Sequence, residues 1–426
     1  MKPVAQGRAA RFAVAWVALA LLFAALPAQG AELVILDTGG GTRPDLIEDL
    51  VQMFQSQHPG VEVLVERRGV WETLEQAVIR IAAGNPPDLV WASVSAIEGY
   101  AAQGVAQDLT PWIERDAWDV GGLHPELVQG YQSYFPGEQI ALPFTFQHHT
   151  LYYNGSLFDA SGLARPARDW HWDEFVNIAS TLTQDRSGDG VPDQYGVDSG
   201  WWNPTFYVPL LESFGGRVYN DDRSKSALLH PDTVRAFEAL DDLINLGYAA
   251  VSNVGGLRSS GALGMWYGIS YGITDYIEQL DYDWGITPLP REKGGQGIGI
   301  GDNGFWIPKA SNNKDLAWEF LKLALGTEGQ ALQVKHNLIP VRLEALQGLE
   351  LVPGASAHVR EALLQNLFAG NVNSLGRMAG PHYTRIIQIL NEHLPKIQGD
   401  EESVTNILSQ AADLIDVELA KPWPEI

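Results

Sequence analysis

Short apolar runs alternate with amphipathic segments along most of the chain. Leu33 to Leu36 is an unbroken apolar run, 61–65 alternates with a period of two, and 89–91 is a further short run. These patterns predict buried strands. Between and after them the apolar residues recur at the helical spacing, as in Ile47/Leu50/Val51/Phe54, Leu74/Val78/Ile81, Phe175/Ile178/Ala179/Leu182, Val234/Phe237/Leu240/Ile244, and across 315–325 and 403–419. Strand–helix alternation favours an α/β fold with a mostly parallel sheet covered on both faces.

The first thirty residues follow a different pattern. Lys2, Arg8 and Arg11 flank the start of an apolar run from Phe12 to Leu26, and small residues lead to Gly30. A basic segment, an apolar run and a small-residue site are typical of a secretory signal peptide. A membrane anchor is the alternative, but spanning needs ~20 apolar residues, more than this run has. We predict that residues 1–30 are a signal peptide, cleaved near Gly30, and that the mature chain is periplasmic.

Composition narrows the class of protein. Of 426 residues, 45% are hydrophobic and 19% charged, which is typical of a globular chain and excludes a disordered one. The net charge of −24 makes nucleic acid a poor partner, since an acidic surface repels phosphate. Cysteine is absent from the sequence. Disulfides, thiolate metal sites and a lipid anchor on cysteine are therefore excluded.

Two glycine motifs match enzyme patterns but lack the expected context. Residues 268–272 fit the G-x-S-x-G pattern of a hydrolase, yet the residues before them make no convincing strand. Residues 299–304 fit G-x-G-x-x-G, but 305–308 reads as a strand, whereas a dinucleotide site needs a helix there. We interpret 299–304 as a glycine-rich loop that approaches another group closely.

An acidic loop at 185–193 resembles the first half of an EF-hand. Oxygen ligands stand at the expected spacing, from the side chains of Asp185, Ser187, Asp189 and Asp193 and the carbonyl of Val191. The twelfth position is glycine rather than glutamate, so a complete EF-hand is excluded. A structural Ca²⁺ site and a solvated acidic turn both stay open.

Two further groups are candidates for ligand contacts. His148 and His149 are adjacent on an extended segment, so they point to opposite faces and do not share a metal; we assign His148 to a hydrogen bond in a cleft. Several tryptophans stand beside chain breaks, where an aromatic face suits a sugar ring. They are Trp71, Trp91, Trp201, Trp202, Trp266 and Trp306.

Several phrases together resemble the family 1 extracellular solute-binding proteins of carbohydrate ABC importers, the group that includes maltose- and glycerol-3-phosphate-binding proteins. Their shared order across nearly the whole mature chain carries the resemblance. The phrases lie at 54–63, 82–90, 100–104, 108–110, 141–144, 151–154, 172–175 and 317–321.

The resemblance implies a two-lobed periplasmic-binding-protein fold (type II), with lobes joined by multiple hinge crossings near Phe144 and Leu263. It places 31–143 and 264–310 in the N-terminal lobe and 144–263 and 311–426 in the C-terminal lobe. Such a receptor performs no chemistry and requires no cofactor. It acts as a monomer, closes on a carbohydrate by hinge motion, and delivers it to a membrane permease driven by an ATPase. The acidic loop matches a family loop that sometimes holds calcium.

The resemblance also implies the residues of the cleft. They are Gly41, Thr42, Trp91, Ser93, Ser95, Gln147, Trp201, Trp202, Trp266, Tyr267, Asp302, Asn303, Arg342 and Arg377. The charged sugar contacts of the maltose branch are missing at Val94 and Ser95, which disfavours maltodextrin. A non-sugar solute, such as a sugar phosphate, a polyamine or an iron chelate, stays open as an alternative. Arg43, Arg67 and Arg68 allow an anionic one, because a guanidinium suits phosphate. An exported glycoside hydrolase is a further alternative, but no acid–base pair is marked.

Overall fold

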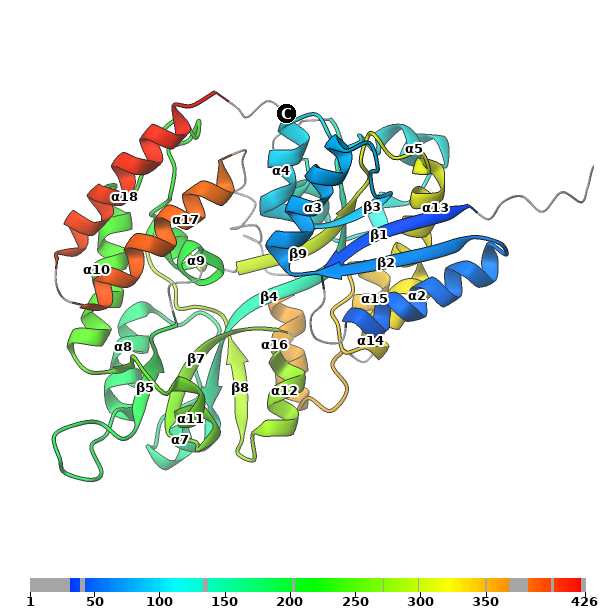
Figure 1. Ribbon diagram of the computed structural model, residues 1–426. Helices are drawn as coiled ribbons and strands as arrows, with labels where there is room; N and C mark the ends of the chain where they lie inside the picture. Colours follow the sequence, from blue (N-terminus) through cyan, green and yellow to red (C-terminus); the bar gives the residue numbers. More distant parts are fainter. Residues whose placement is uncertain are drawn as a thin grey trace, which may run out of the picture.

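Two long strands run between the two lobes of the molecule (Figure 1). β4 (Leu142–Asn154) and β9 (Gly299–Trp306) pair antiparallel, from Leu142 opposite Phe305 to His149 opposite Gly299. Beyond this stretch β8 (Trp284–Thr287) replaces β9 beside β4. The computed structural model describes residues 31–38, 43–132, 137–200, 204–270, 272–297, 299–348, 351–367, 382–399 and 402–422.

Within the described residues, nine strands form one sheet that passes through both lobes. Its order is β2-β1-β3-β9-β4-β7-β5-β6, with β8 beside β4. The remaining strands are β1 (Glu32–Thr38), β2 (Glu62–Arg68), β3 (Leu89–Ser93), β5 (Tyr195–Asp198), β6 (Ala249–Ala250) and β7 (Leu263–Ile269). Pairing is parallel at both ends of the sheet and antiparallel where β9, β4 and β7 meet.

The first lobe is built on the parallel strands β2, β1 and β3. Leu33 and Ile35 point to one face of β1 and pack in a core with Leu50 and Phe54, while Leu36 belongs to a separate core on the other face. Because both faces of β1 are covered, its middle residues, Leu33 to Leu36, are all apolar. The helices of this part are α2 (Arg43–Gln57), α3 (Val70–Ala82), α4 (Val94–Ala102), α5 (Thr110–Arg115) and α6 (Pro125–Gly130), with the single turn η1 (Val120–Gly122).

The second lobe is built on β7, β5 and β6. Its core joins Val197 and Met265 of the sheet to Phe175 and Phe237 of the covering helices. Pro231 fits at the first turn of α10 (Pro231–Asn245) because an N–H at that position would have no helical partner. The helices are α7 (Gly155–Ala160), α8 (Trp172–Leu182), α9 (Pro204–Phe214), α10 (Pro231–Asn245), α11 (Val254–Ser259) and α12 (Gly272–Gln279).

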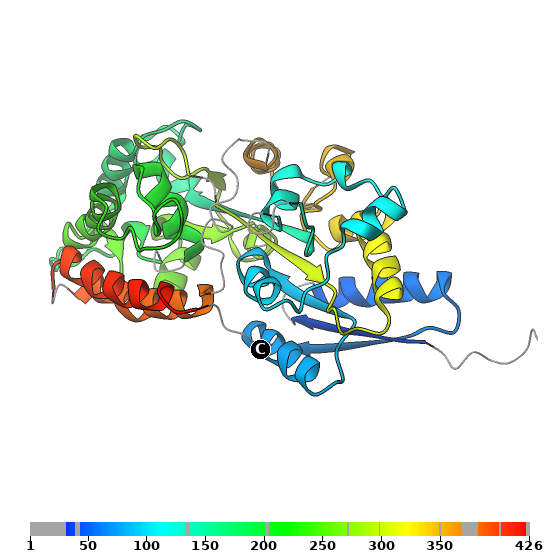
Figure 2. The same cartoon turned by 90° about the horizontal axis from the view of Figure 1, so that it is seen from above.

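The C-terminal helices divide between the lobes, which differs from the predicted boundaries. α13 (Lys314–Leu325) and α14 (Thr327–Lys335) pack on α2 of the first lobe, and α16 (Ala357–Leu367) packs on β8. α17 (Tyr383–His393) and α18 (Val404–Leu419) pack with α10 along the second lobe (Figure 2). The prediction placed all of 311–426 in the second lobe. The short elements α15 (Leu343–Gly348) and η3 (Leu394–Gly399) complete the fold.

The return crossing also differs from its predicted position. β7, which begins at Leu263, pairs with β5 and with the second-lobe half of β4, so the chain stays in the second lobe there. β9 makes the return, from Gly299 beside His149 to Phe305 beside Trp91. The predicted glycine-rich loop at 299–304 is thus a strand. None of the helices among the described residues is long and apolar enough to span a membrane.

Candidate functional site

The carboxyl ends of the parallel strands of both lobes meet at the crossing of β4 and β9. In the first lobe, Ser93 ends β3 and lies opposite Asn303 of β9, which in turn lies opposite Thr145 of β4. In the second lobe, Ile269 ends β7 and lies opposite His149 of β4. Ligands of open α/β sheets bind outside such carboxyl ends. The crossing is therefore the candidate binding site.

A cluster of polar and aromatic side chains, here the hinge cluster, lies on the second-lobe side of the crossing: Gln147, His149, Asp198, Phe206 and Tyr267. The Tyr267 hydroxyl hydrogen-bonds Nδ1 of His149, and the two rings stack with centroids 6.0 Å apart. Phe206 of α9 meets the Tyr267 ring edge-on at 4.4 Å, and the Tyr267 N–H donates to Asp198 Oδ1 at 3.3 Å. Gln147 and His149 are two residues apart on β4, hence on one face.

The imidazoles at the hinge are neutral. Burial, and to a lesser extent the neighbouring His148, lowers the pKa of His149 to about 3. Burial with the nearby positive charge of Arg168 lowers the pKa of His148 to about 3 as well. A neutral imidazole offers one donor and one acceptor. Nε2 of His149 is buried and has no partner among the described residues, so it can still take a hydrogen bond.

Of the two adjacent histidines, His149 rather than His148 belongs to the hinge cluster. His148 lies on the opposite face of β4, together with Phe146 and Tyr152, which pack in the core that extends from the first lobe. It is completely buried, and neither ring nitrogen has a partner among the described residues. Period-two alternation predicted that the two rings separate, but it did not tell which one meets Tyr267.

Three predicted ligand-stacking tryptophans fill cores instead. Trp91 of β3 is 3% exposed and belongs to the core of the first lobe, and Trp306 is completely buried beside Tyr100. Trp266 is also completely buried and stacks on Tyr152 at 5.7 Å. For these three tryptophans, a position beside a chain break marks a core ring rather than a ligand contact. Side chains of a strand alternate between its two faces, and this alternation separates Trp266 from Tyr267. Trp266 lies on the face of β7 where Tyr152 packs, and Tyr267 lies on the opposite face.

Two of the three arginines that kept an anionic solute open, Arg67 and Arg68, are paired with carboxylates, while the side chain of Arg43 lies outside the described part. Arg67 contacts Glu48 at 3.1 Å and the buried Asp37 at 3.9 Å, and Arg68 contacts Glu66 at 3.6 Å. No anion is needed to balance the charges of Arg67 and Arg68, so these two give no support to the anionic-solute alternative. Asp37, near the carboxyl end of β1, was not among the predicted site residues.

Arg342, a predicted ligand contact, has a structural role in the first lobe. Its Nε donates to the carbonyl of Leu325 at 2.8 Å, and Nη1 lies 3.4 Å from Asp119. Its guanidinium also lies 5.8 Å from the centre of the Trp118 ring. The side chain is only 10% exposed. These contacts hold the turn before α15 against α13 and the segment before α6.

Other predicted site residues cannot be placed. The backbones of three of them lie in α3, α4 and β9, while their side chains are outside the described part: Trp71, Ser95 and Asp302. Five further positions lie outside the described residues altogether: Gly41, Thr42, Trp201, Trp202 and Arg377. Ser93, Gln147, Tyr267 and Asn303 are the predicted residues that the structure brings to the crossing.

The acidic loop at 185–193 folds around its own backbone. Asp185 accepts from the N–H groups of Gly188 at 2.6 Å and Gly190 at 2.8 Å, which lower its pKa. Asp193 accepts from the N–H of Ser187 at 2.8 Å, and Asp189 from that of Val191 at 2.9 Å. Among the described residues no three carboxylate or imidazole groups gather to hold a metal ion. Calcium binding here stays a prediction.

The G-x-S-x-G segment does follow a strand, contrary to expectation, because β7 ends at Ile269 and α12 begins at Gly272. Ser270 is nevertheless not placed as a nucleophile. It is 3% exposed, and its Oγ accepts a hydrogen bond from the backbone N–H of His148 at 3.0 Å. No imidazole among the described residues is hydrogen-bonded to this hydroxyl. A serine hydrolase needs that contact to activate the serine.

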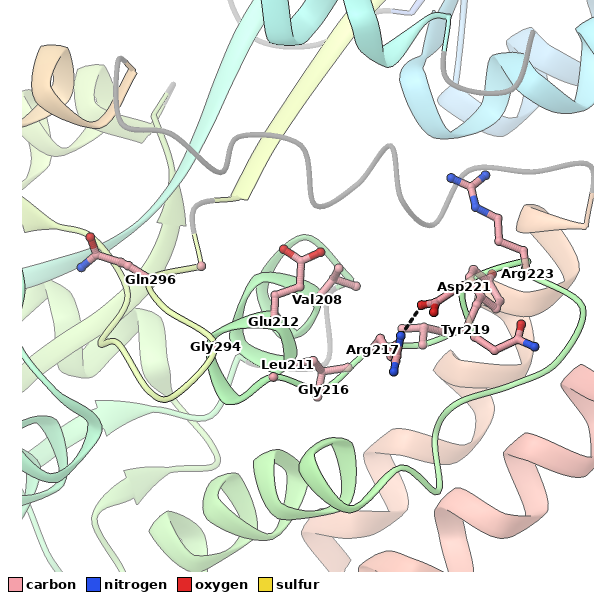
Figure 3. Close-up of a pocket in the computed structure, with 14 residues that line it drawn as sticks. Val208, Leu211, Glu212, Gly216, Arg217, Tyr219, Asp221, Arg223, Gly294 and Gln296 are labelled. Atoms are coloured by element: carbon pink, nitrogen blue, oxygen red, sulfur yellow. Dashed lines mark hydrogen bonds and ion pairs between the residues drawn. The ribbon is translucent and has the colours of Figure 1, made fainter. Parts of the chain in front are cut away.

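A cavity of about 570 Å³, here the α9 cavity, lies along α9 in the second lobe (Figure 3). Its lining comes from Val208, Leu211 and Glu212 of α9, from residues between 215 and 223, and from residues between 294 and 297. The last of these segments leads directly into β9. Arg217 forms an ion pair with Asp221 at its rim.

Two lobes, two crossing strands and a polar site at their junction define a solute-binding protein of the clamp type. The chain belongs to the bacterial extracellular solute-binding protein family, whose family model matches residues 38–331. Its fold is the type II periplasmic-binding-protein fold. The protein Lmo0181 of Listeria monocytogenes, solved in complex with cycloalternan, superposes with a TM-score of 0.79 at 20% identity, over 92% of this chain and all of that one.

Curated relatives match most of the chain. The diacetylchitobiose-binding protein DasA of Streptomyces coelicolor is 24% identical over 341 residues, 75% of each chain. The mannitol-binding protein of Pseudomonas aeruginosa is 25% identical over 329 residues, 72% of each chain. A solute-binding protein of Agrobacterium radiobacter, solved with ribitol, superposes at a TM-score of 0.76 with 23% identity, over 92% of this chain and all of that one.

Proposed function

We propose that this protein is a periplasmic receptor that captures a sugar, whether an oligosaccharide, a sugar alcohol or a sugar derivative, between its lobes and delivers it unchanged to an ABC importer. The observation that carries the proposal is the convergence of strand ends from both lobes on the β4–β9 crossing. Since both lobes contribute to one site, a ligand there contacts both and favours their closure. Such closure by hinge motion is the functional change of the fold.

The chemistry of the hinge cluster supports a neutral, hydroxyl-rich ligand. Gln147 and the neutral His149 offer both donors and acceptors, and the ring of Tyr267 is only partly buried. An aromatic face beside amide and imidazole groups suits a sugar, which carries apolar C–H faces and hydroxyl edges. The names of the relatives point the same way, because they bind diacetylchitobiose, mannitol and arabinooligosaccharide.

A thermal-shift screen of monosaccharides, oligosaccharides, polyols and sugar phosphates tests the proposal. A ligand at 100 times its Kd should stabilise the protein by ~2.7 kcal/mol. The same ligand should change tryptophan fluorescence and reduce the radius of gyration, and it should be recovered chemically intact. Binding of sugar phosphates alone, or release of a cleaved sugar, would contradict the proposal.

Variants locate the site. Gln147→Ala should weaken sugar binding about 2- to 12-fold, because a hydrogen bond to a neutral partner contributes about 0.5–1.5 kcal/mol. Gln129→Ala is the matched control, since Gln129 is an exposed residue of α6 on the first lobe. Equal affinities of both variants and the unchanged protein would place the ligand elsewhere.

A further inference from the structure

The α9 cavity and the hinge cluster share two structural elements. α9 supplies Phe206 to the hinge cluster and Val208 to Glu212 to the cavity. Gln296 and Gly297 line the cavity, and two residues later Gly299 pairs with His149. Six residues of helix separate Phe206 from Glu212, about 9 Å along the axis. The cavity therefore extends the candidate site outward along the second lobe.

The wall between 294 and 297 is held firmly against α9. A Cβ atom on Gly297 would lie 1.8 Å from the carbonyl oxygen of Pro209, and one on Gly294 would lie 2.1 Å from that of Glu212. The Gly294 N–H donates to the carbonyl of Ser213 at 2.8 Å. Backbone packed this closely does not move independently, so this side of the cavity is formed before any ligand arrives. Preformed cavities are typical of small-molecule sites.

The lining of the α9 cavity combines an apolar floor with balanced charges. Val208 and Leu211 are buried residues of α9, and the charged groups are Glu212, Arg217, Asp221 and Arg223. Two carboxylates and two guanidiniums leave no net charge. Figure 3 shows Arg217 directed toward Asp221 at one end of the cavity and Gln296 at the other. This lining disfavours a phosphate or a cation and suits hydroxyl groups, which both accept and donate.

We infer that the α9 cavity binds the outer unit of an elongated sugar, so that the ligand is an oligosaccharide with its inner unit at the hinge cluster. The inference rests on the proposed function and deepens it. A single sugar ring at His149 would leave the α9 cavity, with its volume of about 570 Å³, empty. Arg217 and Asp221 also line a second cavity of about 320 Å³. Their ion pair therefore separates the two cavities, and the outer sugar unit would contact it.

A chain-length series tests the inference. A thermal-shift assay first identifies which of glucose, N-acetylglucosamine, mannose and arabinose gives the largest shift. That monosaccharide and its di- to tetrasaccharides are then titrated by calorimetry. We expect an oligosaccharide to bind at least about 10-fold more tightly than its monomer. Arg217→Ala should remove most of that roughly 10-fold advantage, since it deletes hydrogen bonds to the outer unit, while leaving the monomer affinity unchanged.

A matched control separates a local effect from a general one. Arg385 of α17 is as exposed as Arg217, at 45%, and also pairs with a carboxylate, at 3.7 Å, so Arg385→Ala should leave every affinity unchanged. Equal affinity for monomer and oligosaccharide, or equal weakening of both by Arg217→Ala, would overturn the inference while sparing the proposed function. A complete lack of response to sugars would overturn the proposed function itself.

Discussion

The hydroxyl of Tyr267 is hydrogen-bonded to Nδ1 of His149, and their rings stack nearly parallel, at 8°, across β4 and β7. This pair joins the crossing strand to the second lobe at the candidate site. The direction of this hydrogen bond sets the tautomer of His149. If the Tyr267 hydroxyl donates, Nε2 carries the proton; if Nδ1 donates, Nε2 is left as an acceptor.

Replacing Tyr267 by phenylalanine should destabilise the protein. Tyr267→Phe leaves Nδ1 of His149 without its partner, and a buried polar group left unpaired costs about 1–3 kcal/mol. The measurement is urea unfolding followed by circular dichroism. Tyr207→Phe is the control, because the Tyr207 hydroxyl is buried and has no partner among the described residues. That change should be neutral or stabilising, and the opposite order of the two variants would contradict the pairing.

Stability should fall as the pH is lowered below about 6.5, because His148 and His149 are held neutral in the folded state. Their folded pKa values are about 3, below the ordinary 6.5, so the unfolded chain binds protons first. For each histidine, the free energy of unfolding should fall by about 1.4 kcal/mol per pH unit as the pH drops from 6.5 to 3. Above pH 6.5 neither histidine should lower it.

The variant His148→Phe isolates one of these two contributions. No hydrogen bond of the ring is lost, because neither nitrogen has a partner among the described residues. Unfolding free energies measured from pH 7.5 to 5 should therefore depend less steeply on pH in the variant, by about one proton. A slope equal to that of the unchanged protein would show that His148 is not buried neutral.

The sequence predicted the class of fold and most elements, because each buried face leaves a periodic pattern. The predicted strands at 33–36, 61–65 and 89–91 lie within β1, across the start of β2 and within β3. It failed where pairing between distant segments decides the structure. Nothing local to Leu263 or Gly299 shows which of them re-enters the first lobe, since that depends on which strand pairs with β3.

The same limit explains the errors at the site. Trp266 and Tyr267 are adjacent, and only the register of β7 against β4 shows that Trp266 meets Tyr152 in the core while Tyr267 meets His149. Of the residues that the resemblance selected, Gln147 and Tyr267 lie at the crossing, whereas Arg342 has its partners in distant turns. Asp198 and Phe206 were missed because neither belongs to a motif.

Asp88 should be critical for the stability of the first lobe. It is 4% exposed, and its oxygens accept from the Val34 N–H at 2.9 Å and the Ser311 hydroxyl at 2.7 Å. These bonds tie the segment after β9 to β1. Asp88→Asn replaces one carboxylate oxygen by an NH2 group that faces the Val34 N–H or the Ser311 hydroxyl, both of which donate to Asp88. We therefore expect the free energy of unfolding in urea to fall by about 2–3 kcal/mol.

The control for Asp88 is Asp159→Asn on the second lobe. Asp159 is 67% exposed and pairs with Arg165 at 2.8 Å, and exposed pairs contribute about 0–1 kcal/mol. A loss for Asp159→Asn as large as that for Asp88→Asn would show that the buried contacts at Asp88 are not the cause.

Calcium binding by the 185–193 loop predicts that Ca²⁺ raises the melting temperature and that a chelator reverses the gain. The reason is electrostatic: Asp185, Asp189 and Asp193 lie close together in sequence, and backbone N–H groups keep the pKa of Asp185 low, so its carboxylate stays charged. Asp189→Asn should abolish the gain, since it removes a charged ligand, and Mg²⁺ should replace Ca²⁺ poorly because it demands a tighter octahedral shell. Identical melting curves with Ca²⁺ and with chelator would identify the loop as a solvated turn held by its own backbone.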